Sequence, residues 1–205
     1  MLRASLAGMI ALILVSCVTQ RATYEPPEPV DRDDRHRRVV NRPYDDVWDA
    51  LIQHAAATYF LIDNFEKDSG LITLTFGSEN PSDFVDGGLW TLKAFKHGHS
   101  FEFDGKYVDY LATYQELTLI GRMNIVVRAI STDQCEVAVN ARYIVNSIAR
   151  DATGLKVAEN NWSFTSGGED TIMVRNPGKG TKSAARTLRP TYLAEETILD
   201  ALEAL

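Results

Sequence analysis

Few side chains in this chain have the types and spacing that chemistry requires. Cys17 follows Leu14-Val15-Ser16 and carries a thiol, which can form a disulfide, bind a metal or attack an electrophile. His97-Gly98-His99 is the only close histidine pair, and on a strand both rings would point to one face, as a metal site needs. Only Glu102 and Asp104 could add a third ligand, and this tripeptide is also typical of a polar turn. We therefore expect no metal site.

No catalytic constellation is indicated either. The segment Gly178-Lys179-Gly180-Thr181-Lys182-Ser183 lacks the first glycine of a phosphate-binding loop at the required spacing. Asp83 with Asp86, or Asp104 with Asp109, could share acid and base work, but a chain this acidic contains such pairs by chance. No serine lies in the glycine-flanked turn of a hydrolase. We expect no catalytic residue, no enzyme activity and no cofactor.

The residues before Cys17 give that thiol a different role. Arg3 precedes an uncharged apolar run, residues 6–15, which is too short to span a bilayer because a spanning helix needs about 20 apolar residues. With Leu14-Val15-Ser16-Cys17 at its end, this segment resembles the signal peptide of bacterial lipoproteins. An ordinary cleaved secretory signal is the alternative. The resemblance implies cleavage after residue 16 and lipid attachment to Cys17. The residue after the cysteine is Val18, which resembles the pattern of lipoproteins that are sorted to the outer membrane.

Lipid attachment has consequences for location and for the second cysteine. A bacterial lipoprotein carries three acyl chains, which hold a protein on a membrane almost permanently. We thus expect the folded part to lie in the periplasm, attached to the outer membrane. Cys135 would have no disulfide partner in the chain, and it falls in the apolar set of an alternating strand, so we expect a buried side chain rather than a reactive thiol.

Length and charge are those of one acidic globular domain. The chain has 205 residues, 45% hydrophobic residues and a formal net charge of −7, and removal of residues 1–16 takes away Arg3 and no acid. Binders of nucleic acid present a basic face, so this balance argues against such a partner.

Residues 17–37 are expected to form a disordered tether, followed by a single periplasmic domain over residues 38–205. The tether contains Pro26, Pro27 and Pro29 and has little to bury, so it cannot order itself. The charged run at 31–38 is either solvated or in contact with anionic lipid headgroups.

The domain is predicted to begin with a short strand at 39–41 and an amphipathic helix. Pro43 followed by Asp45 and Asp46 is a favourable helix start, and apolar residues then recur every three to four positions as far as Tyr59. Residues 60–65 and 71–76 are predicted to form a hairpin, with Gly70 in its turn.

The rest of the domain is predicted to be mainly antiparallel strands. Glycine and proline interrupt residues 77–117, where short strands are indicated at 89–95 and 101–107. Residues 122–130 and 135–143 alternate as a second hairpin, and 155–164 forms another strand. A final helix is expected over 190–205, with Ala194, Ile198 and Leu202 inward and Glu195 outward.

Between these elements, residues 171–190 are predicted to be a basic loop without acidic residues. Its cations could contact acidic partners or lipid headgroups, and a solvated loop is the alternative. The candidate contact residues are Arg175, Lys179, Lys182, Arg186 and Arg189.

This order of elements predicts an α+β fold, an antiparallel sheet with one face covered by an N-terminal and a C-terminal helix. Residues 43–51 and 67–73 resemble the BamC-like helix-grip domains of bacterial outer-membrane lipoproteins. The resemblance implies a non-enzymatic binding or scaffold subunit of an envelope protein assembly, with other envelope proteins as partners. The alternative is a carrier that holds a lipid or another hydrophobic ligand between the sheet and the C-terminal helix.

Overall fold

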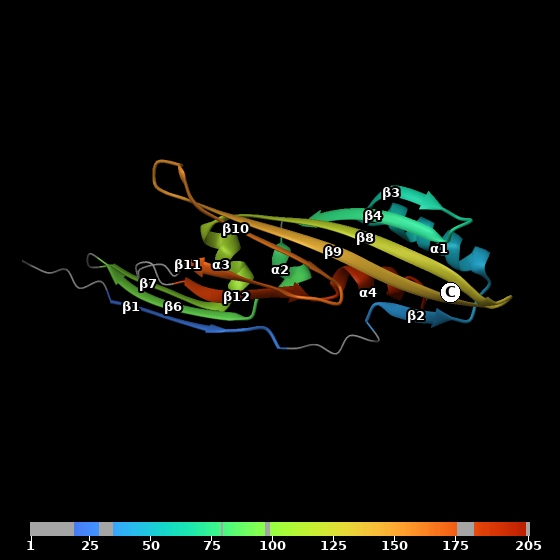
Figure 1. Cartoon of the computed structure of the whole chain (residues 1–205), viewed down its shortest axis with the longest axis horizontal. Helices are drawn as coiled ribbons and strands as arrows, with labels where there is room; N and C mark the ends of the chain where they lie inside the picture. Colours follow the sequence, from blue (N-terminus) through green and yellow to red (C-terminus); the bar gives the residue numbers. More distant parts are fainter. Residues whose placement is uncertain (1–18, 29–34, 79, 97–98, 176–182, 204–205) are drawn as a thin grey trace, which may run out of the picture.

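The computed structural model describes residues 19–28, 35–78, 80–96, 99–175 and 183–203. In these ranges the chain forms antiparallel strands in three sheets, together with four short helices. Figure 1 shows an elongated arrangement, with β1, β6 and β7 at one end and α1, β3 and β4 at the other. The predicted α+β class with antiparallel strands is confirmed. The expected single sheet is not seen, because the strands divide among three sheets.

The largest sheet is built on one long hairpin. Its strand order is β10-β9-β8-β4-β3, and β2 pairs with the remaining part of β9. Both predicted hairpins are present, although β8 and β9 extend well beyond the expected ranges. The bounds are β2 Arg37–Val40, β3 Leu61–Glu66, β4 Leu71–Ser78, β8 Glu116–Ser131, β9 Gln134–Arg150 and β10 Lys156–Thr165.

Two helices cover one face of this sheet near the turn of the long hairpin. Helix α1 spans Tyr44–Ala57, α4 spans Leu193–Asp200, and the two helices contact each other as well as β9. Alternate residues of β8 and β9 are buried under them, including Met123, Ile125 and Val139. At this end, the apolar faces of two helices therefore pack on an alternating sheet face. The C-terminal helix is shorter than the predicted range.

Gly70, in the turn of the first hairpin, packs closely against β8. Its φ of +69° suits a residue without a Cβ, and a side chain there would collide with the carbonyl of Val127. Its own carbonyl accepts a hydrogen bond from the Val127 amide at 2.8 Å. The predicted turn at Gly70 is confirmed, and the close approach of β8 gives a second reason for glycine.

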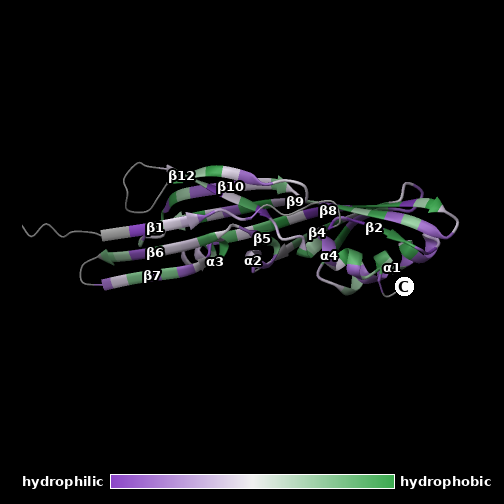
Figure 2. Cartoon of the chain, turned by 90° about the horizontal axis from the view of Figure 1, so that it is seen from below, coloured by the Kyte–Doolittle hydropathy of each residue, from purple (hydrophilic) through white to green (hydrophobic). Residues whose placement is uncertain are grey.

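A second sheet contains the N-terminal segment that we expected to be disordered. Strand β1, Thr19–Glu25, pairs with β6, Leu89–Lys96, which pairs with β7, His99–Lys106. Figure 2 shows hydrophilic and hydrophobic residues alternating along β6 and β7. Ala22 and Tyr24 of β1 pack against the core. The predicted disordered tether is wrong for residues 19–25. The prediction gave weight to the prolines and overlooked the alternation of these residues, which lets β1 pair with β6.

Helix α3, Tyr107–Tyr114, lies against this second sheet through a set of aromatic rings. Tyr110 contacts Trp90, Phe103 and Tyr114 with ring centroids 5.1–5.7 Å apart. The strands predicted near 89–95 and 101–107 are confirmed as β6 and β7, whereas α3 has no counterpart among the predicted elements.

The third sheet replaces much of the expected basic loop. Strand β11, Asp170–Arg175, pairs with β12, Ser183–Pro190, and the end of β12 pairs with β5, Val85–Asp86. Helix α2, Pro81–Phe84, precedes β5. Residues 171–175 and 183–190 are thus a hairpin, since their alternate apolar residues, such as Ile172 and Leu188, pack inward.

Candidate functional site

Arg186 of β12 lies where the three sheets meet. Its guanidinium carbon is 4.4 Å from the ring centroid of Tyr24, 4.6 Å from that of Trp90 and 5.5 Å from that of Tyr107. The residue is only 3% exposed. Its carbonyl accepts a hydrogen bond from the indole of Trp162 in β10 at 3.2 Å. Arg186 therefore connects β12 to the second sheet through cation–π contacts and to the largest sheet through its backbone.

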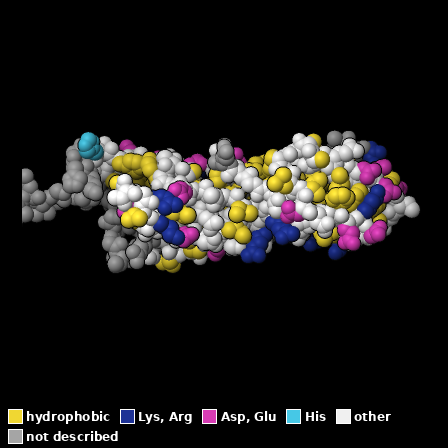
Figure 3. Space-filling model, turned by 90° about the horizontal axis from the view of Figure 1, so that it is seen from above, with side chains coloured by type: hydrophobic (Ala, Val, Ile, Leu, Met, Phe, Trp, Pro, Cys, Tyr) yellow, Lys and Arg dark blue, Asp and Glu magenta, His cyan; other side chains and the backbone are white. Residues whose placement is uncertain are grey.

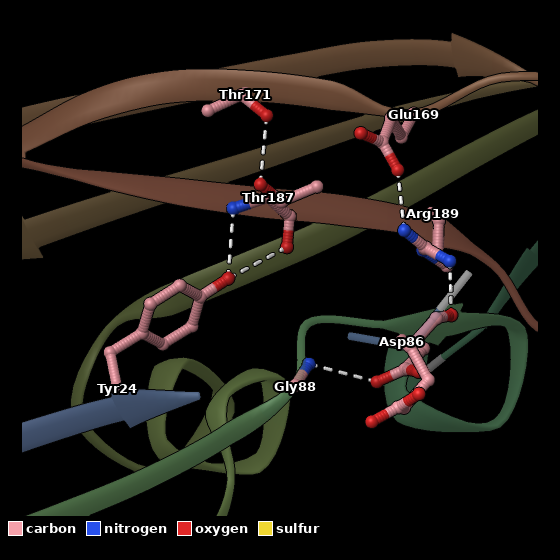
Figure 4. Close-up of polar contacts among 8 residues, drawn as sticks. Tyr24, Asp86, Gly88, Glu169, Thr171, Thr187 and Arg189 are labelled. Atoms are coloured by element: carbon pink, nitrogen blue, oxygen red, sulfur yellow. Dashed lines mark hydrogen bonds and ion pairs between the residues drawn. The ribbon is translucent and has the colours of Figure 1, made fainter. Parts of the chain in front are cut away.

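The N-terminal segment is fastened to β12 at two further positions (Figure 4). The Tyr24 hydroxyl accepts a hydrogen bond from the Thr187 amide at 2.9 Å and donates one to the Thr187 carbonyl at 3.2 Å. Arg189 is buried, donates to the carbonyl of Glu28, and forms an ion pair with Glu169 at 2.5 Å. Residues 19–28 are consequently part of the folded body.

These contacts bear on the five cationic residues that were predicted to contact acidic partners or lipid headgroups. Arg186 and Arg189 are buried and engaged inside the molecule, so neither presents its charge to a partner. Arg175 ends β11, while Lys179 and Lys182 lie outside the described residues. The structure brings Arg186 and Arg189 together on one strand, as stabilising groups of the sheet junction.

A surface groove of about 710 Å³ runs beside this junction. The segment from Glu25 to Glu28 forms one wall, and β5 with Gly88 and Leu89 forms another. Gly88 has a φ of +74°, and a side chain there would collide with the backbone of Glu25 and Pro26. Charged residues of both signs line the groove: Glu25, Glu28, Arg35, Asp86 and Lys106. Apolar residues line it as well: Pro26, Pro27, Val85, Leu89 and Pro190. Such a mixed lining suits a peptide-like contact that offers polar and apolar groups together.

A smaller hollow of about 390 Å³ lies at the opposite end of the second sheet. The pairing register places the first residue of β1, Thr19, opposite Phe95, and places Phe95 opposite Ser100. Arg21, Lys93 and Phe101 also line the hollow. Phe95 is 51% exposed, which makes it a large apolar side chain at the edge of the molecule.

The edge strand β3 carries a second exposed apolar group at the other end of the molecule. Leu61 is 69% exposed, Phe65 is 58% exposed, and Tyr59 lies just before the strand with nearly half its surface exposed. Figure 3 shows hydrophobic side chains near this end of the molecule, with acidic side chains beside them. An edge strand with exposed apolar side chains is a ready template for another chain.

Glu195 is the buried acid that sequence reasoning missed. We predicted an outward side chain, but the residue is fully buried and accepts a hydrogen bond from the Tyr143 hydroxyl at 2.6 Å. Burial raises the pKa of Glu195, although the hydroxyls of Ser166 and Tyr143 act in the opposite direction. The spacing of Glu195 from Leu199 and Leu202 already places it on the inward stripe of α4.

The other residues considered for chemistry are dispersed. Cys135 is fully buried, as predicted, and burial raises the pKa of its thiol. Cys17 and His97 lie outside the described residues, and His99 is exposed in β7. Among the residues that the structure describes, no three His, Cys, Asp or Glu side chains are placed to hold a metal ion. Within the same ranges, no helix is both long and apolar enough to cross a bilayer.

Comparison with known proteins gives no relative from which a function could be transferred. No protein-family profile, no curated protein and no solved structure matches the chain.

Proposed function

We propose that the chain is an outer-membrane lipoprotein of the periplasm that acts as a non-enzymatic scaffold subunit of an envelope protein assembly. The observation that carries the anchor is Leu14-Val15-Ser16-Cys17 at the end of a short apolar run, immediately before β1. Two or more acyl chains on Cys17 would hold the protein at the membrane almost permanently.

A filled core and an exposed apolar edge strand favour the scaffold role. The apolar side chains Trp48, Phe76 and Val139 are buried in a continuous core, so the face of the largest sheet under α1 and α4 is occupied by the protein itself. Leu61 and Phe65 on the edge strand β3 provide an exposed apolar surface for a partner chain. A partner could add a strand at this edge or pack on its side chains.

The likeness to helix-grip domains belongs to the same proposal. The contacts of helices α1 and α4 with each other and with the same long strand, β9, support this part of the proposal. The second and third sheets are additions to that unit. They leave the helix-covered end free to present β3, and we assign partner binding to this end.

The anchor is tested by replacing Cys17. In cells, Cys17→Ser should move the protein from the membrane fraction to the soluble periplasmic fraction, and the parent should yield an acylated N-terminal peptide by mass spectrometry. Cys135→Ser is the matched control, because its fully buried thiol has no role in anchoring. A parent without acyl groups, or a Cys17→Ser protein that stays on membranes after a high-salt wash, contradicts the proposal.

Partner binding is tested by a photo-crosslinking amino acid at Leu61 in intact cells. We expect a discrete adduct with an envelope protein from position 61 and none from position 173, where Met173 of β11 is 65% exposed and serves as the matched control. Equal adduct patterns from both positions would argue against a specific surface on β3.

A further inference from the structure

We propose that the outer end of the sheet formed by β1, β6 and β7 rests on the membrane surface, so that the protein stands on this end. We call this end the tip; it consists of Thr19, Arg21, Lys93, Phe95 and Ser100. The proposal rests on the lipid anchor proposed above and adds the orientation of the molecule and the surface that contacts lipid headgroups.

The chain between the proposed lipid and the fold is short. Cys17 is two residues before Thr19, the first residue of β1. Two residues in a fully extended chain span at most about 7 Å. The first residue of β1 must then lie at the level of the headgroups, because the acyl chains on Cys17 are buried in the bilayer.

Strand β1 is held firmly in the fold. It pairs with β6 over its whole length, and its Tyr24 is bonded to Thr187 of β12. Arg189 holds the carbonyl of Glu28, three residues beyond the strand. Strand β1 therefore cannot act as a flexible linker without losing these contacts, and a lipid on Cys17 fixes the position of the whole domain.

The side chains of the tip suit a membrane surface. Phe95 is half exposed beside an apolar hollow that Phe101 also lines, and exposed apolar side chains such as Phe enter the boundary between headgroups and acyl chains. Arg21 and Lys93 lie beside this hollow, and their cations suit anionic headgroups. Lys93 is paired with Glu102, so Arg21 is the cation expected to contribute more.

The opposite end of the molecule carries several acidic side chains. Helix α1 begins with Asp45 and Asp46, and Figure 3 shows acidic side chains at that end with Lys and Arg side chains among them. Strand β8 alone, with 16 residues, spans about 50 Å, which separates its hairpin turn from the tip by far more than the Debye length of about 8 Å. This end thus points away from an anionic surface.

The test compares two positions on the same face of β6. Phe95 and Leu89 have nearly equal exposure, 51% and 52%, and six residues of strand place them about 20 Å apart. In the mature lipidated protein, Phe95→Cys or Leu89→Cys is labelled with an environment-sensitive dye. Cys135 is fully buried and does not compete for the label. Each labelled protein is reconstituted into vesicles of phosphatidylethanolamine and phosphatidylglycerol that contain a headgroup nitroxide.

We expect the dye at position 95 to lose most of its fluorescence to the nitroxide and the dye at position 89 to keep most of it. Mass spectrometry of the same preparations reports the acyl chains. Acyl chains present with equal quenching at the two positions overturn the orientation and leave the anchor intact. Absence of the acyl chains overturns the anchor and the orientation together.

A second measurement isolates the tip from the acyl chains. The soluble Cys17→Ser form should bind anionic vesicles weakly, and Arg21→Gln in that form should lower its partition coefficient about fivefold, as expected for the loss of one cation near an anionic surface. Lys106→Gln, at the other end of β7, is the matched control and should change nothing. Equal losses for the two variants would contradict a membrane contact at the tip.

Discussion

Individual buried polar residues hold the sheets of this protein in position. Arg186 places its charge among the rings of Tyr24, Trp90 and Tyr107, and desolvated cation–π contacts of this kind contribute about 2 kcal/mol or more. Glu195 and Tyr143 form a fully buried pair between α4 and β9. A buried carboxyl is costly to ionise, so the contribution of Glu195 depends on pH.

Glu195→Gln should reveal this dependence. Burial raises the pKa of Glu195 above its unfolded value of about 4.3, so the folded state holds a proton that the unfolded state has lost. The stabilising contribution is complete below the unfolded pKa and is lost as pH rises through the folded pKa. Glutamine keeps an acceptor for Tyr143 and does not ionise. The variant should gain stability relative to the parent as pH rises from about 4 to about 8.

Urea denaturation of both proteins at several pH values measures this difference. Each unit by which the folded pKa exceeds the unfolded pKa corresponds to about 1.4 kcal/mol at high pH. Glu196→Gln on the solvent side of α4 is the control and should show little pH-dependent gain. A stability difference that stays constant across the pH range would mean that Glu195 titrates at its unfolded pKa.

At the scale of elements, the least expected feature is the docking of β1. Gly88 permits it, because its hydrogen atom faces the backbone of Glu25 and Pro26. Its φ of +74° also disfavours other residues. The amide of Gly88 donates to Asp86 at 2.8 Å, and its carbonyl accepts from Tyr107 at 2.9 Å, so this turn also positions α3.

Gly88→Ala should therefore release the N-terminal segment. The added methyl group collides with the end of β1, and we expect trypsin to cleave after Arg21 faster than in the parent. Gly154→Ala is the matched control, because Gly154 has a φ of +84° and open space around its Cβ position. It carries similar backbone strain of about 1–2 kcal/mol without the collision. Equal acceleration in both variants would show that general destabilisation, rather than release of β1, causes the cleavage.

Helix α4 is expected to be essential for the packing of the largest sheet. Ile198 is fully buried on the inner face of this helix, so Ile198→Ala should lower the free energy of unfolding by about 2–5 kcal/mol. Asp200→Ala on the exposed face removes only a surface ion pair with Arg38 and should cost less than about 1 kcal/mol. Chemical denaturation of both variants checks the prediction, which a loss below about 1 kcal/mol for Ile198→Ala would contradict.

At the scale of the whole molecule, the three sheets form one elongated body (Figure 1), and we have proposed that one end contacts lipid and the other a partner chain. A scaffold of this shape would hold a partner bound at β3 away from the membrane surface, because the body is long. A carrier would instead need an enclosed apolar cavity, commonly of about 300–1,000 Å³. The groove beside β5 has a suitable volume, about 710 Å³, but it opens at the surface, and charged side chains of both signs line it beside apolar ones such as Val85 and Leu89.

Native mass spectrometry distinguishes these two functions. We expect the soluble Cys17→Ser protein, purified from the periplasm, to show the mass of the chain alone, because its core is filled by its own side chains. The same protein incubated with phospholipid and desalted should give the same mass. A reproducible one-to-one lipid adduct would favour the carrier.

Local patterns in the sequence determined much of the fold. The alternation in residues 122–130 and 135–143 predicted the long hairpin, and the apolar stripe after Pro43 predicted α1. Gly70 marked a turn that the structure contains. These features depend on neighbours within a few residues, so periodicity and turn chemistry are sufficient to find them.

Tertiary structure decided the rest, because it depends on residues far apart in the chain. Strand β1 is stable only because β6 and Thr187 provide its partners, and Tyr24 is separated from Thr187 by 163 positions. In the sequence alone, Arg186 and Arg189 resemble solvated loop cations. Their buried contacts depend on the position of β12 beside the second sheet and Glu169. Tyr192, with a φ of +70° before α4, has no sequence signal, since its strained backbone is held by surrounding packing. The sequence by itself therefore determined the two predicted hairpins, helix α1 and the proposed lipid site. Only long-range burial and pairing decided that the segment after Cys17 belongs to the folded body, because the free energy that orders it comes from contacts with distant strands.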